Sequence, residues 1–283
     1  IHDRNRVITQ QDERAVILYY TDKSRPSLNM EGYFILKIDN PVNYAMKATP
    51  TGNDRWPAIW SKKANIYTFG GALSGKLAGS EHWKYRAEGA IQTGRKEGLN
   101  LPAGNARVGM RNLMAFGTND RIEYHFNDAK KNKLRGSFEY LSGDDPGTGK
   151  NEAFDPLWGE WPRISEILLY VYNLETQAGE VSNLYRLGFG HSMQLTEKIA
   201  MDTDLHLLWA DQNTRKGTMH GSGLGWSSGG GYRGTLATWQ LKCNLTKNLT
   251  GHLLLEYFQP GNYYAGGSRD AAYFARINAD YTF

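Results

Sequence analysis

The sequence has few of the features that identify disulfide-stabilised, nucleic-acid-binding or helical membrane proteins. Its one cysteine, Cys243, excludes an internal disulfide and is more typical of an inert surface or lipid-facing residue than of a nucleophile. The formal charge of +4 is too small to indicate nucleic acid as a partner, since no basic run is interleaved with stacking aromatics. No run approaches the roughly 20 apolar residues of a membrane helix. Residues 1–4 lack the layout of a signal peptide.

Glycine and aromatic residues are abundant instead. The chain has 32 Gly, 17 Tyr and 8 Trp against 9 Pro, which suggests aromatic strands joined by flexible loops. A mean hydropathy of −0.59 is typical of soluble proteins. Membrane barrels are also polar on average, because every second strand residue faces water. The periodicity of the sequence therefore has to decide between the two classes.

The clearest periodicity is at the C-terminus. Residues 273–283 alternate at the period of a strand, with Ile277, Tyr281 and Phe283 on an apolar face and Arg276 on the mostly polar one. We expect Tyr281 and Phe283 to lie in the periplasmic aromatic girdle of a barrel. This terminal aromatic resembles the signature that the barrel-assembly machinery reads, and it favours an outer-membrane strand over a soluble amphipathic one.

Similar segments recur along the whole chain. They predict an all-β, antiparallel transmembrane barrel with about eleven strands in residues 1–283, taken as a single domain, with boundaries uncertain by about two to four residues. The expected strands are 14–21, 29–38, 66–75, 84–93, 114–126, 132–141, 183–194, 199–210, 232–246, 249–259 and 273–283.

The connections between these strands alternate in length. Short ones alternate with long ones at about 39–64, 94–112, 142–181, 212–231 and 260–269. Short periplasmic turns and long outer loops are typical of outer-membrane barrels. With Phe283 at the periplasm, every long connection falls on the outer side. An odd strand number is unusual for bacterial barrels, so we expect a longer protein whose N-terminal strands and signal peptide precede Ile1.

Several motifs from about residue 65 to the end resemble the alginate-export family of outer-membrane porins. They are 85–94 (YRAEGAIQTG), 138–145 (FEYLSGDD), 154–158 (FDPLW) and 182–184 (SNL), in that order and spacing. Residues 1–14 also resemble a loop-to-strand stretch from the middle of such proteins. The resemblance implies a wide barrel of about eighteen antiparallel strands in the bacterial outer membrane, of which this chain would form the last eleven.

The resemblance also implies diffusion of an anionic polyuronate through a lumen with arginines. The sequence departs from the family pattern at Ala72, where an inward arginine is expected, and at Leu236 and Thr238, where acids are usual. These departures leave the identity of the polymer open. The implied partners are the lipid bilayer and lipopolysaccharide, an anionic polysaccharide, the barrel-assembly machinery and periplasmic export proteins.

Alternation assigns a set of charged side chains to the lumen. Arginine suits a polyuronate because its planar fork binds a carboxylate through two hydrogen bonds, and neighbouring acids would keep binding weak enough for conduction. The alternative is that charges of both signs only brace the wall. The predicted lumen set is Arg86, Glu88, Arg121, Glu123, Arg135, Glu139, Arg186, Asp204, His206, Lys242, Glu256, Arg276 and Asp280, with the five arginines as the main pathway.

The segment 142–181 carries Asp144, Asp145, Asp155 and Glu160 beside two tryptophans. Clustered oxygens suit Ca²⁺, so an outer loop that binds calcium or stacks on sugars is one interpretation. The other is a polar loop that folds partly into the pore. No other cofactor or metal site is expected, since the histidines show no ligand spacing and the glycine-rich stretch 221–225 lacks the context of a nucleotide site.

Three other functions compete with a polysaccharide pore. An outer-membrane hydrolase is disfavoured, because the one adjacent Ser-His pair, His191 and Ser192, points to opposite faces of a strand and no G-x-S-x-G motif is present. A plugged structural barrel and a general porin remain open. The small inward residues Gly70, Ala72, Ser74, Gly188 and Gly190 fit either open space or room for a plug.

Overall fold

The structure is a computed structural model of the chain. It describes residues 11–25, 27–41, 63–100, 106–145, 147–158, 164–167, 182–213, 229–264, 266 and 269–283. Within these residues, no helix has both the length and the apolar character that crossing a bilayer would require.

Eleven strands form one antiparallel sheet in which each strand pairs with its neighbours in sequence. This confirms the predicted all-β antiparallel fold. The strands are β1 (Gln11–Arg25), β2 (Leu28–Pro41), β3 (Ala64–Lys76), β4 (Trp83–Asn100), β5 (Ala106–His125), β6 (Lys133–Leu141), β7 (Leu184–Thr196), β8 (Ile199–Trp209), β9 (Tyr232–Asn244), β10 (Leu249–Pro260) and β11 (Ala272–Tyr281), with a short 3-10 turn η1 (Leu77–Gly79) before β4.

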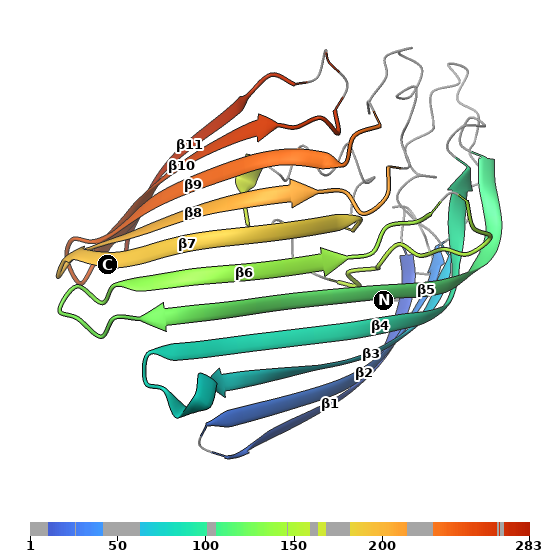
Figure 1. Ribbon diagram of the computed structural model, residues 1–283, viewed down its shortest axis with the longest axis horizontal. Coiled ribbons are helices and arrows are strands. Elements are labelled where there is room, and N and C mark those ends of the chain that lie inside the picture. The colour runs from blue at the N-terminus through green and yellow to red at the C-terminus, as the bar shows by residue number, and fades with distance from the viewer. Residues whose placement is uncertain are drawn as a thin grey trace.

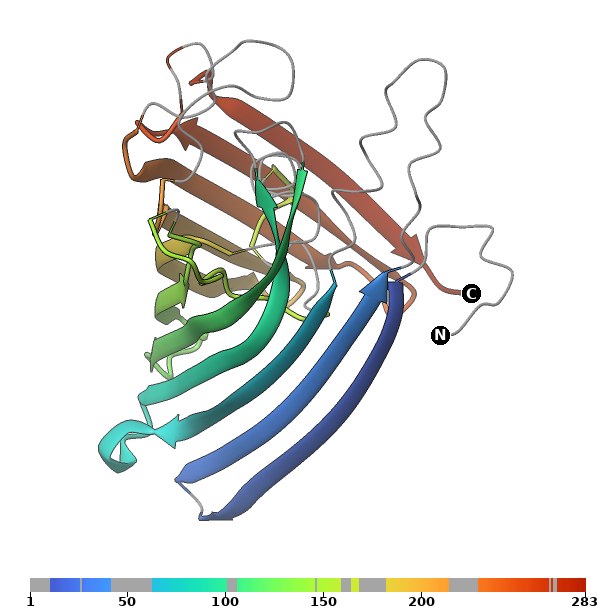
Figure 2. The ribbon, with the colours of Figure 1, turned by 90° about the vertical axis from the view of Figure 1, so that its right-hand side faces the viewer.

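The sheet is long and curved, with β1 and β11 at its two edges (Figures 1 and 2). The connections β1–β2, β3–β4, β5–β6, β7–β8 and β9–β10 lie at one end, which we call the turn end, and the other connections lie at the opposite end (Figure 1). Figure 2 shows the yellow-green segment after β6 inside the curve of the sheet. An open, curved sheet of this kind fits part of a barrel.

The two faces of the sheet carry different side chains. Large apolar residues such as Phe69, Phe189 and Ile277 are exposed on the convex face, and Ile277 is 84% exposed. The concave face carries the charged residues of the same strands, as expected for period-two alternation. A continuous exposed apolar band around a polar interior is typical of a lipid-facing barrel wall.

Aromatic and polar contacts organise the turn end. Tyr124 packs edge-on against Trp83 and Phe126, with ring centroids 4.9 Å and 5.0 Å apart, as in an interfacial aromatic girdle. In the turn after β5, the Asn132 side chain and backbone N–H donate to Asp128 at 2.6 Å and 2.9 Å. These hydrogen bonds lower the pKa of the Asp128 carboxyl.

The sequence prediction was wrong about the connection at 94–112. β4 extends to Asn100 and β5 begins at Ala106, so the two strands pair far beyond the expected ends. A register shift between Glu97 and Gly98 breaks the period-two pattern there. The part of β4 beyond residue 93 also carries charged residues in place of apolar ones. The alternation of apolar and polar residues that predicts a strand is therefore missing there.

Candidate functional site

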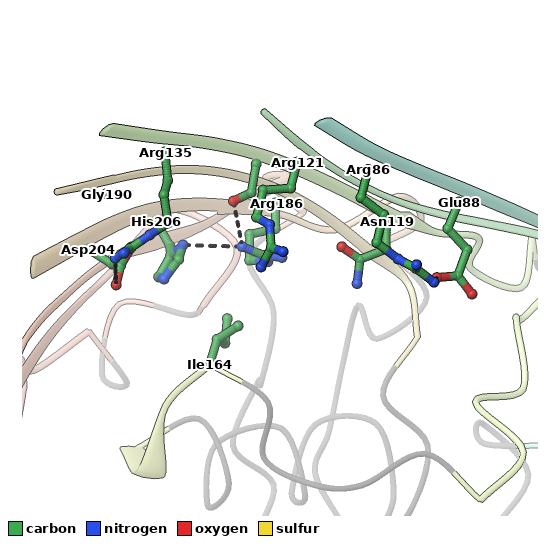
Figure 3. Close-up of a pocket in the computed structure, with 11 residues that line it drawn as sticks. Arg86, Glu88, Asn119, Arg121, Arg135, Ile164, Arg186, Gly190, Asp204 and His206 are labelled. Carbon is green, nitrogen blue, oxygen red and sulfur yellow. Dashed lines mark hydrogen bonds and ion pairs between the residues drawn. The ribbon is translucent and has the colours of Figure 1, made fainter. Parts of the chain in front are cut away.

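The predicted lumen residues lie on the concave face of the sheet. Seven of them line one cavity of about 430 Å³, in which side chains from β4 to β8 converge (Figure 3). These seven are Arg86, Glu88, Arg121, Arg135, Arg186, Asp204 and His206. The cavity brings four of the five proposed pathway arginines together. It does not include Glu123, Glu139, Lys242, Glu256, Arg276 or Asp280.

Several of the other predicted residues have partners elsewhere on the concave face. Glu123 pairs with Lys133 at 3.4 Å, and Lys242 pairs with Asp202 at the same distance. Asp280 accepts a hydrogen bond from Asn278. Glu256 lines a second cavity of about 250 Å³.

Wall carboxylates hold most of the arginines. Arg135 pairs with Asp202 at 3.0 Å and with Asp204 at 2.9 Å, and the nearly buried Arg186 pairs with Glu139 at 2.9 Å. Such charge-assisted pairs fix the guanidinium planes along the wall. Arg121 is held less firmly, since its Nε lies 3.3 Å from Glu123 and its side chain is 55% exposed.

Arg86 makes a contact that spans three strands. Its Nη2 lies 3.0 Å from Glu31 on β2 and 2.9 Å from Glu88 on β4. On β3, Ala72 lies between these strands, in register with both Glu31 and Glu88. The small side chain at this position leaves room for the ion pair to form across β3. Ala72 therefore has a structural role where the family pattern led us to expect an arginine.

The inward glycines do not leave open space, contrary to one sequence interpretation. A Cβ on Gly190 would lie 2.1 Å from Asp204 Oδ1 and 2.8 Å from Arg135 Nε. A Cβ on Gly70 would meet the ring of Tyr33 at 2.3 Å. Larger neighbours from adjacent strands therefore lie over these glycines, and their absent side chains let the charged groups lie flat against the wall.

The segment after β6 folds onto the concave face, as one interpretation of the sequence predicted. Asn151 forms a parallel bridge with Leu113 on β5, and the Phe154 ring covers Gly117. Asp155 then meets the wall at two points. The Gln92 side-chain amide both donates to and accepts from its backbone, at 2.6 Å and 2.7 Å, and Lys96 pairs with its carboxylate at 2.7 Å.

Trp158 continues these contacts to β2 and β1. Its ring lies under Lys37 Nζ, 5.2 Å from the ring centroid, and its indole N–H donates to Glu13 at 2.9 Å. Lys37 also donates to the Leu157 carbonyl at 3.0 Å. Residues 151–158 thus contact four strands of the sheet, β1, β2, β4 and β5.

A second stretch of the same segment contacts the opposite edge of the sheet. Glu256 on β10 accepts hydrogen bonds from Ser165 Oγ at 2.8 Å, from the Glu166 N–H at 3.2 Å and from the Ile167 N–H at 3.0 Å. Arg276 on β11 pairs with Glu166 at 2.6 Å. Ile167 is buried in an apolar cluster with residues of β6 to β10.

The described carboxylates of this segment have partners other than a metal. Asp144 pairs with Arg111 at 2.9 Å and accepts from the Glu152 N–H, and Asp155 is held by Lys96. Among the described residues, no group of three or more His, Cys, Asp or Glu side chains could hold a metal ion. Glu160 lies outside the described residues. The contacts that are described therefore favour the inward-folding interpretation over a calcium loop.

The sequence analysis missed Glu31, Gln92, Lys96 and Asp202. Glu31 and Asp202 follow the inward alternation of their strands, so the pattern was sufficient to find them. Lys96 lies on the part of β4 that was not predicted, and Gln92 was not distinguished from other polar wall residues. The contacts of both with Asp155 depend on the fold of the segment after β6.

Comparison with known proteins identifies the family. The family model described as "Alginate export" matches residues 37–276, which is most of the chain. Two solved structures are similar at low identity. A NanC porin is 8% identical with a TM-score of 0.38, covering 96% of this chain and 94% of its own. OmpT, an outer-membrane protein of Vibrio cholerae, is 11% identical with a TM-score of 0.32, covering 95% of each chain.

No curated protein matches the chain. The family match confirms the resemblance seen in the sequence motifs, and it agrees with the antiparallel sheet and its exposed apolar face. It points to a pore that transports a solute rather than to an enzyme. The chain belongs to the alginate-export family of bacterial outer-membrane proteins.

Proposed function

We propose that this protein forms an outer-membrane pore through which an anionic polysaccharide, such as a polyuronate, diffuses along an arginine-containing lumen. The observation that carries this proposal is the convergence of Arg86, Arg121, Arg135 and Arg186 on one cavity of the concave face. A guanidinium binds a carboxylate through two parallel hydrogen bonds, and four of them in one place suit a polymer with a carboxylate on every sugar.

The carboxylates of the wall would weaken the binding of a sugar carboxylate to each arginine of the lumen. Each of Arg86, Arg135 and Arg186 is already paired with at least one acid of the wall. A sugar carboxylate must compete with these acids, so each site binds weakly and the polymer is released to the next site. Conduction requires sites of this kind, since tight sites would trap the solute. Arg121 has the most exposed guanidinium of the four and would make the first contact.

Further partners follow from the same proposal. The convex apolar face would contact the lipid bilayer and, on the outer side, lipopolysaccharide. Tyr281 and Phe283, which are 65% and 105% exposed, would lie in the girdle and serve recognition by the barrel-assembly machinery. Periplasmic proteins that deliver the polymer would meet the turn end.

A general porin is the second candidate. The observation that favours it is the pairing of the wall arginines, because charges that only brace the wall would be arranged in the same way. A general porin would conduct small ions but would have no preference for a uronate over a neutral sugar.

Single-channel conductance of the full-length protein in a planar bilayer tests the proposal. Oligouronate should block the open channel, and a neutral oligosaccharide of the same length should not. Arg121→Gln should weaken the block by roughly tenfold or more, because a charge-assisted hydrogen bond contributes about 1.5–3 kcal/mol. Arg25→Gln removes an arginine at the exposed turn end and is the matched control. A channel that oligouronate does not block would be a general porin, and an unchanged block in Arg121→Gln would remove Arg121 from the pathway.

A further inference from the structure

Two described stretches of one segment, residues 151–158 and 164–167, connect the two edges of the sheet. We call them together the crossbar. At one end the Trp158 indole donates to Glu13 on β1, at 2.9 Å. At the other end Glu166 pairs with Arg276 on β11, at 2.6 Å. β1 and β11 are the first and last strands of the sheet order, so the crossbar contacts both of its edges.

The chain between the two stretches is short. Trp158 and Ile164 are six residues apart, which limits the distance between their Cα atoms to about 21 Å. A path along the curved wall from β1 to β11 crosses ten strand spacings of about 4.8 Å each, or about 48 Å in total. The two described stretches contact both edges of the sheet from its concave side, and Figure 2 shows the yellow-green stretch after β6 inside the curve.

Ile164 lies where the crossbar faces the arginine wall. It lines both the cavity of about 430 Å³ and the second cavity of about 250 Å³, and Asp204 of the wall also lines both. In Figure 3 its side chain points toward the row formed by Arg121, Arg135 and Arg186. The gap between this apolar side chain and the charged wall belongs to both cavities.

The crossbar is held firmly at both ends. Glu256 accepts three hydrogen bonds from residues 165–167, and Ile167 is only 6% exposed. Lys96 and Asp155 form an ion pair with side chains 4% and 8% exposed. A buried ion pair at one end and the hydrogen bonds to Glu256 at the other prevent the gap from varying freely, unlike a loop attached only through its stems.

We propose that the crossbar sets the bore of the pore and that Ile164 is its specificity-determining residue. One sugar chain would pass between the Ile164 side chain, which contacts the apolar face of the ring, and the arginine wall, which contacts the carboxylates. A branched or doubled chain would be excluded by size. The nature of the polymer rests on the proposed function, whereas the bore does not.

The test measures the bore with a solute that has no charge. Single-channel conductance of the full-length protein is recorded with polyethylene glycols of increasing size, and the smallest excluded polymer gives the bore. Ile164→Trp should reduce the conductance by roughly twofold and exclude smaller polymers, and Ile164→Gly should shift both in the opposite direction. Ile122→Trp, which adds the same ring on the convex face, is the matched control and should change neither.

The outcomes separate this inference from the proposed function. Unchanged conductance and cut-off in both Ile164 variants would overturn the crossbar as the constriction. Shifted cut-offs in a channel that oligouronate does not block would support the crossbar and refute the polyuronate. A channel that oligouronate blocks, but whose size cut-offs do not shift in the Ile164 variants, would support the polyuronate and refute the crossbar as the constriction. If Ile164→Trp fails to fold, Ile164→Gly decides alone, because it only removes side-chain atoms.

Discussion

The ion pair between Lys96 and Asp155 predicts how firmly the crossbar is attached. The two groups are 2.7 Å apart, and their side chains are 4% and 8% exposed. Lys96→Met keeps the length of the side chain and removes its charge, which leaves a buried carboxylate without its closest cation. Removing one partner of a buried pair costs about 3–5 kcal/mol. Lys37 Nζ remains 3.7 Å from Asp155, so we expect a value near the lower limit.

A loss of about 3 kcal/mol raises the population of the detached crossbar roughly 100-fold. Hydrogen exchange can measure this change at two amides that the crossbar protects. The Asn151 N–H donates to the Asn112 carbonyl at 2.8 Å, and the Met114 N–H donates to the Asn151 carbonyl at 3.0 Å. Both should exchange about 100-fold faster in Lys96→Met, whereas amides between β8 and β9 should not change.

The matched control is Lys76→Met at the turn end. Lys76 pairs with Glu81, but both side chains are substantially exposed. An exposed pair contributes about 0–1 kcal/mol, so exchange at Asn151 should stay at the wild-type rate. Equal rates in the wild type and in Lys96→Met would show that this ion pair does not hold the crossbar, and the reasoning from its burial would be wrong.

Three further substitutions test the charge of the wall, the packing at an inward glycine and the assembly of the barrel. Arg276→Glu should lower anion preference and place two acids together at Glu166, and an unchanged reversal potential in a salt gradient would contradict this. Gly190→Val should displace the Asp204 carboxylate and reduce the heat stability of the folded barrel by several degrees in a gel-shift assay, with Gly149→Val, in open space, as control. Phe283→Ala should lower the amount of assembled protein in the membrane without altering ion selectivity, and normal membrane levels would count against it.

The strands could be predicted because the lipid-facing side imposes a regular pattern. In β11 the outward residues Tyr273, Ile277 and Tyr281 are all more than 60% exposed, and the residues between them are mostly polar. This alternation fixes which side chains face inward, so the inward direction of Arg86 and Arg135 followed from the sequence. The pattern ends where β4 and β5 extend past Glu97 with a register shift, and the prediction ended too early there.

The partners of the site residues could not be predicted in the same way. The contact between Arg86 and Glu31 depends on the register of three strands and on the small side chain of Ala72. The contact between Glu166 and Arg276 depends on the path of a segment without period-two alternation. Local pattern determines the orientation of a strand residue, but register and loop path determine which residue it meets.

The crossbar contacts join residues that are far apart in the sequence, and this separation determines when they form during folding. Neighbouring strands pair through hairpins that are close in sequence, whereas Trp158 and Glu13 are 145 residues apart and Glu166 and Arg276 are 110 residues apart. Contacts of such long range form late, because the intervening chain must first be ordered. Both edges of the sheet must be in place before the crossbar can attach to them. The nascent sheet would therefore enclose a wide, water-filled space, and that space would narrow only in the last step of folding.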